Sequence, residues 1–312
     1  MQDAMAQAGA GLSTFAEVHE QARQAGPRRV GVVLPEDDVS LTAASDALLQ
    51  RIATPVLIGD EERIRARAAA LGLHYLIARA EFVSAGNDAA AIAVRLAREG
   101  RIDVLMKGHL RTDELLHPVL DRQHGLRTDR LLHDVAFFEH RTASSARLIA
   151  ISDGGLNVAP SIEQKRQIVL GTIEALHRIG VSRPRIALVS AVEVVSDAMP
   201  STLDAHALTQ IAGTGVFGEA DVYGPLALDN ALFTWAAEAK GIFHPVAGNA
   251  DALIVPNIEA GNLLAKSIIF LAGRAFGHVV VGATVPILIP SRVESAQDKV
   301  NSIALGVVCA AG

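Results

Sequence analysis

The chain has 312 residues, half of them hydrophobic and only 4% aromatic, and its formal net charge is −6. This length exceeds what one hydrophobic core usually serves, so two domains are expected. The acidic balance and the lack of a basic tract argue against nucleic acid as a partner. The single cysteine, Cys309, excludes an internal disulfide and a cysteine metal cluster.

Membrane and metal proteins have sequence signals that are missing here. No apolar run reaches the roughly 18 residues of a membrane span. Residues 1–13 do not show the order of charge, apolar block and cleavage site of a signal peptide. The 11 histidines are scattered, and no two of them are four residues apart. We therefore expect a soluble cytoplasmic protein without a membrane partner.

Strand-like and helix-like segments alternate along the first part of the chain, which indicates a parallel sheet covered by helices. Thr112 is expected to cap the helix that it begins, and Asn87 or Asp88 the helix at 88–98. The predicted strands are 29–34, 55–58 and 102–106, and the predicted helices are 40–51, 61–70, 88–98 and 112–120.

A second alternating series begins near Gly125. No linker rich in Gly, Ser or Pro separates the two series, so two closely packed domains with a cleft between them are expected. Gly224-Pro225 is expected to begin a helix. The predicted strands are 133–138, 148–152, 185–190, 252–255 and 278–283, and the predicted helices are 160–179, 201–212, 225–239, 259–274 and 293–308.

The densest cluster of chemical groups is Ser291-Arg292 followed by Asp298, a hydroxyl, a guanidinium and a carboxylate. If a helix begins at Ser291, Asp298 lies about two turns further along the same face. Ser291 and Glu294 also form a capping-box pattern, and Ser295 with Asp298 forms a looser version one turn later. Ser291 can therefore cap the last helix, contribute to a site, or do both.

From about residue 28 to residue 310 the chain resembles the phosphate acetyl/butyryltransferase family, and four segments in order carry this resemblance. The third of them is similar to the family segment P-[DN]-[IL]-[EN]-x-G-N, and the second to a run of the butyryl branch. The segments are M-K-G-H-L-R-T at 106–112, G-P-L-A-L-D-N-A at 224–231, P-N-I-E-A-G-N-L at 256–263, and Ser291-Arg292 with Asp298.

The resemblance implies a fold of two three-layer α/β domains, similar to the isocitrate/isopropylmalate dehydrogenase-like fold. Residues 1–125 with 273–312 would form the first domain and 126–272 the second. It also implies the exchange of a short acyl group between CoA and phosphate. CoA is then a substrate, no metal or organic cofactor is needed, and the protein is a homodimer or a larger homo-oligomer.

The resemblance assigns roles to the last segment. Asp298 would deprotonate the CoA thiol, whose free pKa is near 8.5. Ser291 would stabilise the oxyanion or the thiolate, and Arg292 would hold phosphate through its planar fork. A helix beginning there would add backbone donors for an anion.

Further substrate contacts are expected around the first segment. Lys107 and Gly108 end a strand, where open α/β sheets place ligands. His117 stands where the acetyl branch carries an arginine, which favours the butyryl branch and leaves Arg111, Lys107 or Arg127 to supply the charge. The predicted contacts for CoA and phosphate are Lys107, Gly108, Arg111, Thr112, His117 and Asn262.

Two other functions remain open. A non-catalytic protein that binds CoA or acyl phosphate would explain His117 in place of arginine. A metal-dependent 2-hydroxy-acid dehydrogenase would need an acidic metal cluster, and no Asp-x-x-x-Asp lies on a predicted helix. The Gly-x-Gly-x-x-Gly at 213–218 follows a helix and opens none, so it lacks the context of a dinucleotide site and a loop is expected there.

Overall fold

The computed structural model describes residues 11–86, 88–141 and 145–311. The chain divides into two compact units. Unit 1 contains residues 11–14 and His133–Ala275, and unit 2 contains Phe15–Leu132 and Phe276–Gly312. Strands and helices alternate in both units, so the expected α/β class is confirmed.

Unit 2 is built on a mostly parallel sheet with the strand order β3-β2-β1-β4-β11-β10. Only β10 runs antiparallel to its neighbour within this unit, β11. The strands are β1 (Arg28–Val33), β2 (Ala53–Gly59), β3 (Glu81–Ser84), β4 (Val104–Lys107), β10 (Phe276–Val281) and β11 (Ile287–Leu288).

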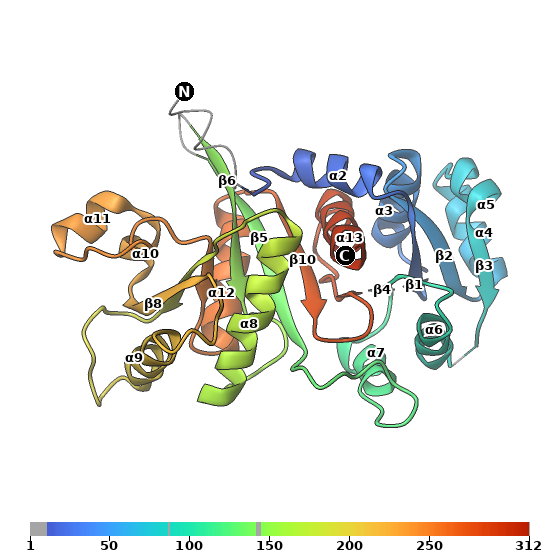
Figure 1. The fold of residues 1–312 in the computed structure, drawn as a ribbon. Coiled ribbons are helices and arrows are strands. Elements are labelled where there is room, and N and C mark those ends of the chain that lie inside the picture. Colours follow the sequence, from blue (N-terminus) through green and yellow to red (C-terminus); the bar gives the residue numbers. More distant parts are fainter. Residues whose placement is uncertain (1–10, 87, 142–144, 312) are drawn as a thin grey trace. The chain divides into compact units, whose positions relative to one another are not determined.

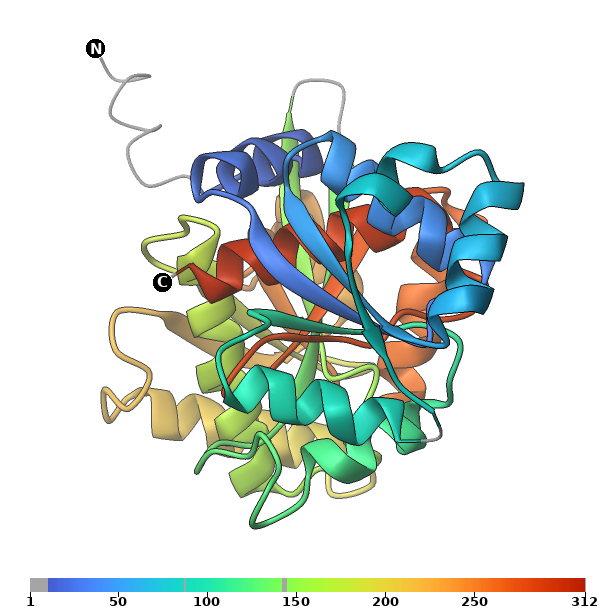
Figure 2. The ribbon, with the colours of Figure 1, turned by 90° about the vertical axis from the view of Figure 1, so that its right-hand side faces the viewer.

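Helices cover both faces of this sheet (Figures 1 and 2). The helices are α2 (Phe15–Gln24), α3 (Asp38–Leu49), α4 (Glu61–Ala70), α5 (His74–Arg79), α6 (Ala89–Arg98), α7 (Thr112–Val119) and α13 (Ala296–Ala310). In Figure 1, α2, α3 and α13 lie on one face, and α6 and α7 lie on the other.

The strand order of unit 2 reverses between β1 and β4. The chain passes from β1 outward to β2 and β3, and then returns to β4 on the other side of β1. Val33 pairs with Lys107, so the two strands end at the same level. Val33, Leu105 and Met106 are fully buried, as expected for parallel strands covered on both faces. Open α/β sheets bind ligands outside the carboxyl ends of the strands at such a switch.

Helix α13 brings its first turn to this carboxyl edge. A Cβ on Gly306 would lie 2.9 Å from Cγ1 of Val104 at the start of β4. Lys299 lies two helical turns before Gly306, which is roughly 10 Å along the helix axis. Lys107 lies three residues after Val104, which is also roughly 10 Å along the strand. At the other end, Asp298 accepts a hydrogen bond from the Phe276 N–H at the start of the antiparallel β10. Lys299 therefore lies at the carboxyl edge of the sheet, where its charge acts on Lys107 at the end of β4.

Unit 1 has the strand order β5-β6-β9-β7-β8, in which only β5 and β6 are antiparallel. Figure 1 shows α8 in front of these strands and α12 behind them. The strands are β5 (His133–Arg141), β6 (Ala146–Ser152), β7 (Arg185–Val189), β8 (Asp221–Leu226) and β9 (Ala252–Ile254). The helices are α8 (Ile162–Arg178), α9 (Pro200–Ala212), α10 (Leu228–Leu232), α11 (Thr234–Ala239), α12 (Ile258–Lys266) and the π-helical η1 (Ser267–Leu271).

The prediction that Gly224-Pro225 begins a helix is wrong, because both residues lie inside β8. A Cβ on Gly224 would lie 2.5 Å from the carbonyl oxygen of Leu188 in β7, so the glycine permits close strand approach. Proline is tolerated because β8 is the last strand of the sheet and has a free edge. The predicted helix 225–239 is replaced by the short helices α10 and α11.

The last helix was also predicted to begin too early. It begins at Ala296, and Ser295 is its N-cap, because the Ser295 hydroxyl accepts a hydrogen bond from the Asp298 N–H. Residues 291–294 form a turn instead. Elsewhere α5 and β3 were not predicted, and the helix predicted at 259–274 ends at Lys266 and continues as η1. The loop expected at 213–218 is confirmed, between α9 and β8.

No helix in the described part of the chain is both long and apolar enough to span a membrane.

We predict that Gly108→Ala destabilises unit 2. The added Cβ would lie 2.5 Å from the Val33 carbonyl oxygen and 2.6 Å from that of Leu34. Overpacking of this kind costs about 1–3 kcal/mol. Gly86→Ala is the control, since among the described residues no atom outside its chain neighbours lies within 4 Å of its Cβ position. Urea unfolding measures both variants, and equal midpoints for the two would contradict the prediction.

Candidate active site

The carboxylate of Asp298 is fixed at the first turn of α13. One oxygen accepts a hydrogen bond from the Phe276 N–H at 3.3 Å, and the other accepts one from the Ser295 hydroxyl at 2.6 Å. Ser295 in turn accepts from the Asp298 N–H at 3.1 Å. Each carboxylate oxygen has two lone pairs, so each retains one for a further donor.

The turn at 291–294 holds Ser291 and Arg292 before the helix. The buried Glu294 carboxylate accepts a hydrogen bond from the Ser291 N–H at 2.8 Å. Its second oxygen lies 3.8 Å from Nε2 of His278, which is also buried. The capping-box contact predicted between Ser291 and Glu294 therefore closes a turn and not a helix. The Ser291 hydroxyl makes no hydrogen bond within the described residues.

Two lysine side chains are buried at the carboxyl end of β4. Lys107 is 5% exposed and Lys299 is 3% exposed. Within residues 11–86, 88–141 and 145–311, neither ammonium group has a hydrogen bond or an ion pair. Buried charged side chains are ordinarily paired, so two lysines without an ion pair at this edge are candidates for a functional site.

Like charges surround these lysines. Burial lowers the pKa of Lys107, and the charges of Lys299 and Arg292 lower it further, while Glu294 and Asp37 raise it. Burial also lowers the pKa of Lys299, and Asp37 and Glu294 oppose this effect. Two cations and two carboxylates therefore act on Lys107, and the three cations outnumber the two carboxylates. We call Lys107, Arg292 and Lys299 the cationic cluster.

The structure does not bring the other predicted cations into this cluster. Arg111 is exposed and its guanidinium pairs with Asp113 at 2.9 Å. His117 lies on the exposed side of α7. Arg127 forms a backbone bridge with Ala283, which precedes β11 and so lies at the opposite edge of the sheet from Lys107. Lys107 is the one proposed substitute for the missing arginine that lies buried at the switch point.

Two predictions about the loop after β4 change. Thr112 was expected to cap α7, but the helix begins at Thr112 itself and Arg111 is the N-cap residue. The Glu114 carboxylate accepts the Arg111 N–H at 2.8 Å. Gly108 was expected to allow close approach of a ligand, and it allows close approach of the chain's own backbone at Val33 and Leu34.

Asn262 belongs to unit 1, on α12. Its side-chain amide donates a hydrogen bond to the Gly154 carbonyl at 3.3 Å. Asp153 accepts hydrogen bonds from the backbone N–H groups of Gly155, Leu156 and Asn157, which holds this loop after β6 in a tight turn. Burial raises the pKa of Asp153, and the nearby Asp134 raises it further. Asn262 thus anchors a loop at the carboxyl edge of unit 1.

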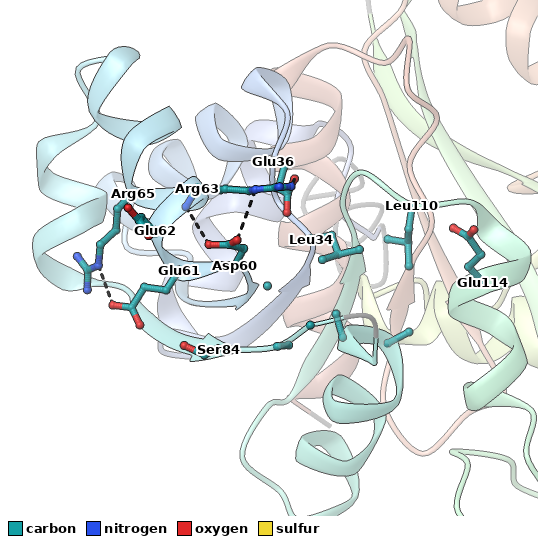
Figure 3. A pocket seen from close by; sticks show the side chains of 15 residues that line it. Leu34, Glu36, Asp60, Glu61, Glu62, Arg63, Arg65, Ser84, Leu110 and Glu114 are labelled. Atoms are coloured by element: carbon teal, nitrogen blue, oxygen red, sulfur yellow. Dashed lines mark hydrogen bonds and ion pairs between the residues drawn. The ribbon is translucent and has the colours of Figure 1, made fainter.

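An open groove of about 1210 Å³ lies beside the cluster, outside the ends of β1, β2 and β3 (Figure 3). Leu34 and Leu110 point into its centre, and Asp60 and Glu61 pair with Arg63 and Arg65 along its rim. Its lining contains more carboxylates than arginines. The groove is therefore a poor place for a phosphate. Among the described residues, no group of three or more His, Cys, Asp or Glu side chains is arranged to hold a metal ion.

Sequence reasoning missed Lys299 and saw Glu294 only as a capping residue. The sequence nevertheless contains a signal for Lys299. Ile303 follows it by four residues and Gly306 follows Ile303 by three, so the three residues lie on one face of the predicted helix. All three are buried, so a lysine stands on the buried face of an apolar helix. Charged residues in that position are rare unless paired or functional.

The chain is thus an α/β protein with cationic side chains near its strand-order switch. The family described as phosphate acetyl/butaryl transferase matches residues 77–307. A phosphate acetyltransferase from Rhizobium meliloti is 41% identical over 292 residues, 93% of this chain and 91% of the relative. A phosphate butyryltransferase from Clostridium acetobutylicum is 36% identical over 301 residues, 96% of this chain and 99% of the relative.

A solved structure agrees with these relatives. The branched-chain phosphotransacylase from Enterococcus faecalis V583 superposes with a TM-score of 0.78 at 27% identity, over 91% of this chain and 99% of that chain. The chain belongs to the phosphate acetyl/butyryltransferase family, and it is a phosphate acyltransferase. The expected family is thereby confirmed.

We predict that Lys107→Met raises the melting temperature at pH 7. A lowered pKa means that folding penalises the charged amine, so the penalty is present below the folded-state pKa and is relieved as the pH rises through it. The gain over the wild type should therefore shrink toward pH 10. Differential scanning calorimetry at both pH values checks this. A lower melting temperature for the variant at pH 7 would show that the Lys107 charge stabilises the fold.

Proposed function

We propose that the chain exchanges a short acyl group between CoA and inorganic phosphate at the carboxyl edge of β1 and β4. The observation that carries this proposal is the Lys107 side chain, which is buried at the end of β4, has no ion pair among the described residues and feels the charge of Arg292. In the forward direction a phosphate oxygen bonds to the thioester carbonyl carbon, the carbon–sulfur bond breaks, and CoA leaves. In the reverse direction the CoA sulfur attacks the acyl phosphate and phosphate leaves.

Lys107 and Arg292 bind the phosphate. Phosphate at neutral pH carries one to two negative charges, and ammonium and guanidinium groups make charge-assisted hydrogen bonds to its oxygens. Arg292, which is exposed in its turn, offers a planar fork. A bound phosphate also offsets the repulsion that Lys107 experiences from the neighbouring cations. Most of the catalysis then comes from holding the two substrates in contact.

Asp298 accepts the thiol proton in the reverse direction and returns it to the departing sulfur in the forward direction. The hydrogen bonds from Phe276 and Ser295 fix the position of the carboxylate and leave lone pairs for the thiol. The Ser291 hydroxyl, which has no partner in the described chain, donates to the oxyanion of the tetrahedral intermediate.

We propose a butyryl-type acyl group. The G-P-L-A-L-D-N-A run and His117 support this choice, while relatives of both names are similar to this chain. We also propose that units 1 and 2 correspond to the two α/β domains of an isocitrate/isopropylmalate dehydrogenase-like fold. The protein would work in the cytoplasm as a homodimer or larger homo-oligomer, with acyl-CoA and phosphate as its partners.

We expect CoA release from short acyl-CoAs only when phosphate is present. A panel from acetyl-CoA to hexanoyl-CoA, read by thiol detection, should give the highest kcat/KM for butyryl-CoA. A maximum at acetyl-CoA would overturn the butyryl assignment and leave the reaction class intact. No release with any member of the panel would overturn the reaction itself.

We expect Asp298→Asn to lower kcat by about 10²- to 10⁴-fold, the usual contribution of a general base. Asparagine keeps an acceptor oxygen for the Phe276 N–H, so the fold and the affinity for CoA should be retained. Calorimetric titration with CoA alongside the kinetic assay checks both parts. Unchanged turnover would remove Asp298 from the mechanism, and a protein that only binds CoA would show no turnover in either form.

A further inference from the structure

We propose that Lys299 is a phosphate-binding residue. Together with Lys107 it supplies the positive charge that is missing because His117 stands in place of an arginine. The two ammonium groups would hold the transferred phosphate between them, with Arg292 as the third contact. This inference rests on the proposed function, because it names residues for the phosphate of that reaction.

The position of Lys299 follows from the packing of α13. Gly306 packs against Val104 of β4, and Asp298 accepts a hydrogen bond from the start of β10, so the helix is fixed at two points on the sheet. Ser302 adds a third point, since its hydroxyl accepts the His278 N–H at 3.0 Å. A helix held in this way cannot turn Lys299 toward solvent, and the side chain is 3% exposed.

The surroundings of Lys299 do not explain it as a structural ion pair. Its attractive neighbours are Asp37 and Glu294, but neither lies within ion-pair distance among the described contacts. Asp37 already accepts the Ser40 N–H as the N-cap of α3, and one Glu294 oxygen accepts the Ser291 N–H. The other Glu294 oxygen is buried and has no hydrogen-bond partner among the described residues, yet it forms no ion pair with Lys299. Lys165 of unit 1 shows the ordinary arrangement, because this buried lysine forms a 2.6 Å ion pair with Asp204.

Asp37 and Glu294 instead shape the site for an anion. They oppose the repulsion between the lysines when phosphate is absent, and they leave the ammonium hydrogens unbonded. Each ammonium has three donors and phosphate accepts at every oxygen, so both lysines can contact one phosphate while Arg292 contacts another of its oxygens. The carboxylates also compete with phosphate, so removing one of their charges should tighten binding.

The test is the binding of inorganic phosphate, by isothermal titration and by its effect on the melting temperature, without CoA present. Lys299→Met should raise the dissociation constant for phosphate at least about tenfold, the loss of one charge-assisted contact. The dissociation constant for CoA should stay within about twofold, and the melting temperature without phosphate should not fall. Lys299→Arg should restore most of the phosphate affinity, because it keeps the charge.

Lys165→Met is the matched control. It removes a lysine that is 6% exposed and ion-paired, so it should lower the melting temperature and leave phosphate affinity unchanged. Asp37→Asn should change the affinity for phosphate in the opposite direction. This second variant keeps the inference testable even if the Lys299→Met protein does not fold. Asparagine also caps helices, so this variant removes a competing charge and should bind phosphate about two- to tenfold more tightly.

Phosphate affinity within twofold of the wild type in Lys299→Met would overturn the inference. So would weaker binding of CoA with phosphate affinity retained, because Lys299 would then contact a phosphate of CoA. Weaker or unchanged phosphate binding in Asp37→Asn would overturn it independently. Because these measurements need no turnover, a protein that binds phosphate through Lys299 but releases no CoA would refute the proposed reaction and not this inference.

Discussion

The parallel pairing of β1 with β4 is the constraint on which the candidate site depends. It makes the strand order reverse at this point, and it ends both strands at the same level, Val33 opposite Lys107. The segments that follow β1 and β4 stay in contact as far as Gly108, which packs closely against the backbone of Leu34. This close contact fixes the backbone of Lys107 at the end of a buried strand.

Helix α13 completes the arrangement from the opposite end of the sequence. Its first turn contributes the Asp298 carboxylate and the Lys299 ammonium as neighbours, and its remaining turns are almost entirely buried and apolar. The unfavourable burial of like charges is thus tolerated because a large apolar contact holds the helix in place. Natural proteins often place such locally destabilising groups at functional sites.

The class of fold and the family could be predicted from the sequence, because alternating segments and ordered motifs are local patterns. The residues that assemble the site could be predicted only in part. Motifs in the sequence contain Lys107, Arg292 and Asp298. Lys299 was not singled out by any motif, and only its burial at the carboxyl edge of the sheet, which is a tertiary feature, makes it a site candidate. The start of α13 was misplaced since two capping patterns overlap, and only the packing of Glu294 against His278 decides between them. Gly224-Pro225 was misplaced because a glycine and a proline usually indicate a turn. Here the glycine is needed for the close approach of β7, and the proline is tolerated in an edge strand.

The discontinuity of unit 2 has a consequence for how the protein folds. Pairing of β4 with β11 joins Leu105 to Ile287, and nearly all of unit 1 lies between them. Closing so long a loop is entropically costly and slow. Prior folding of His133–Ala275 would shorten the effective loop, because a compact unit restricts the distance between its ends. On a ribosome the sheet of unit 2 would therefore remain incomplete until its final strand and helix emerge. During that interval the edge of β4 is unpaired, and this is the stage at which the nascent chain is most exposed to misassociation.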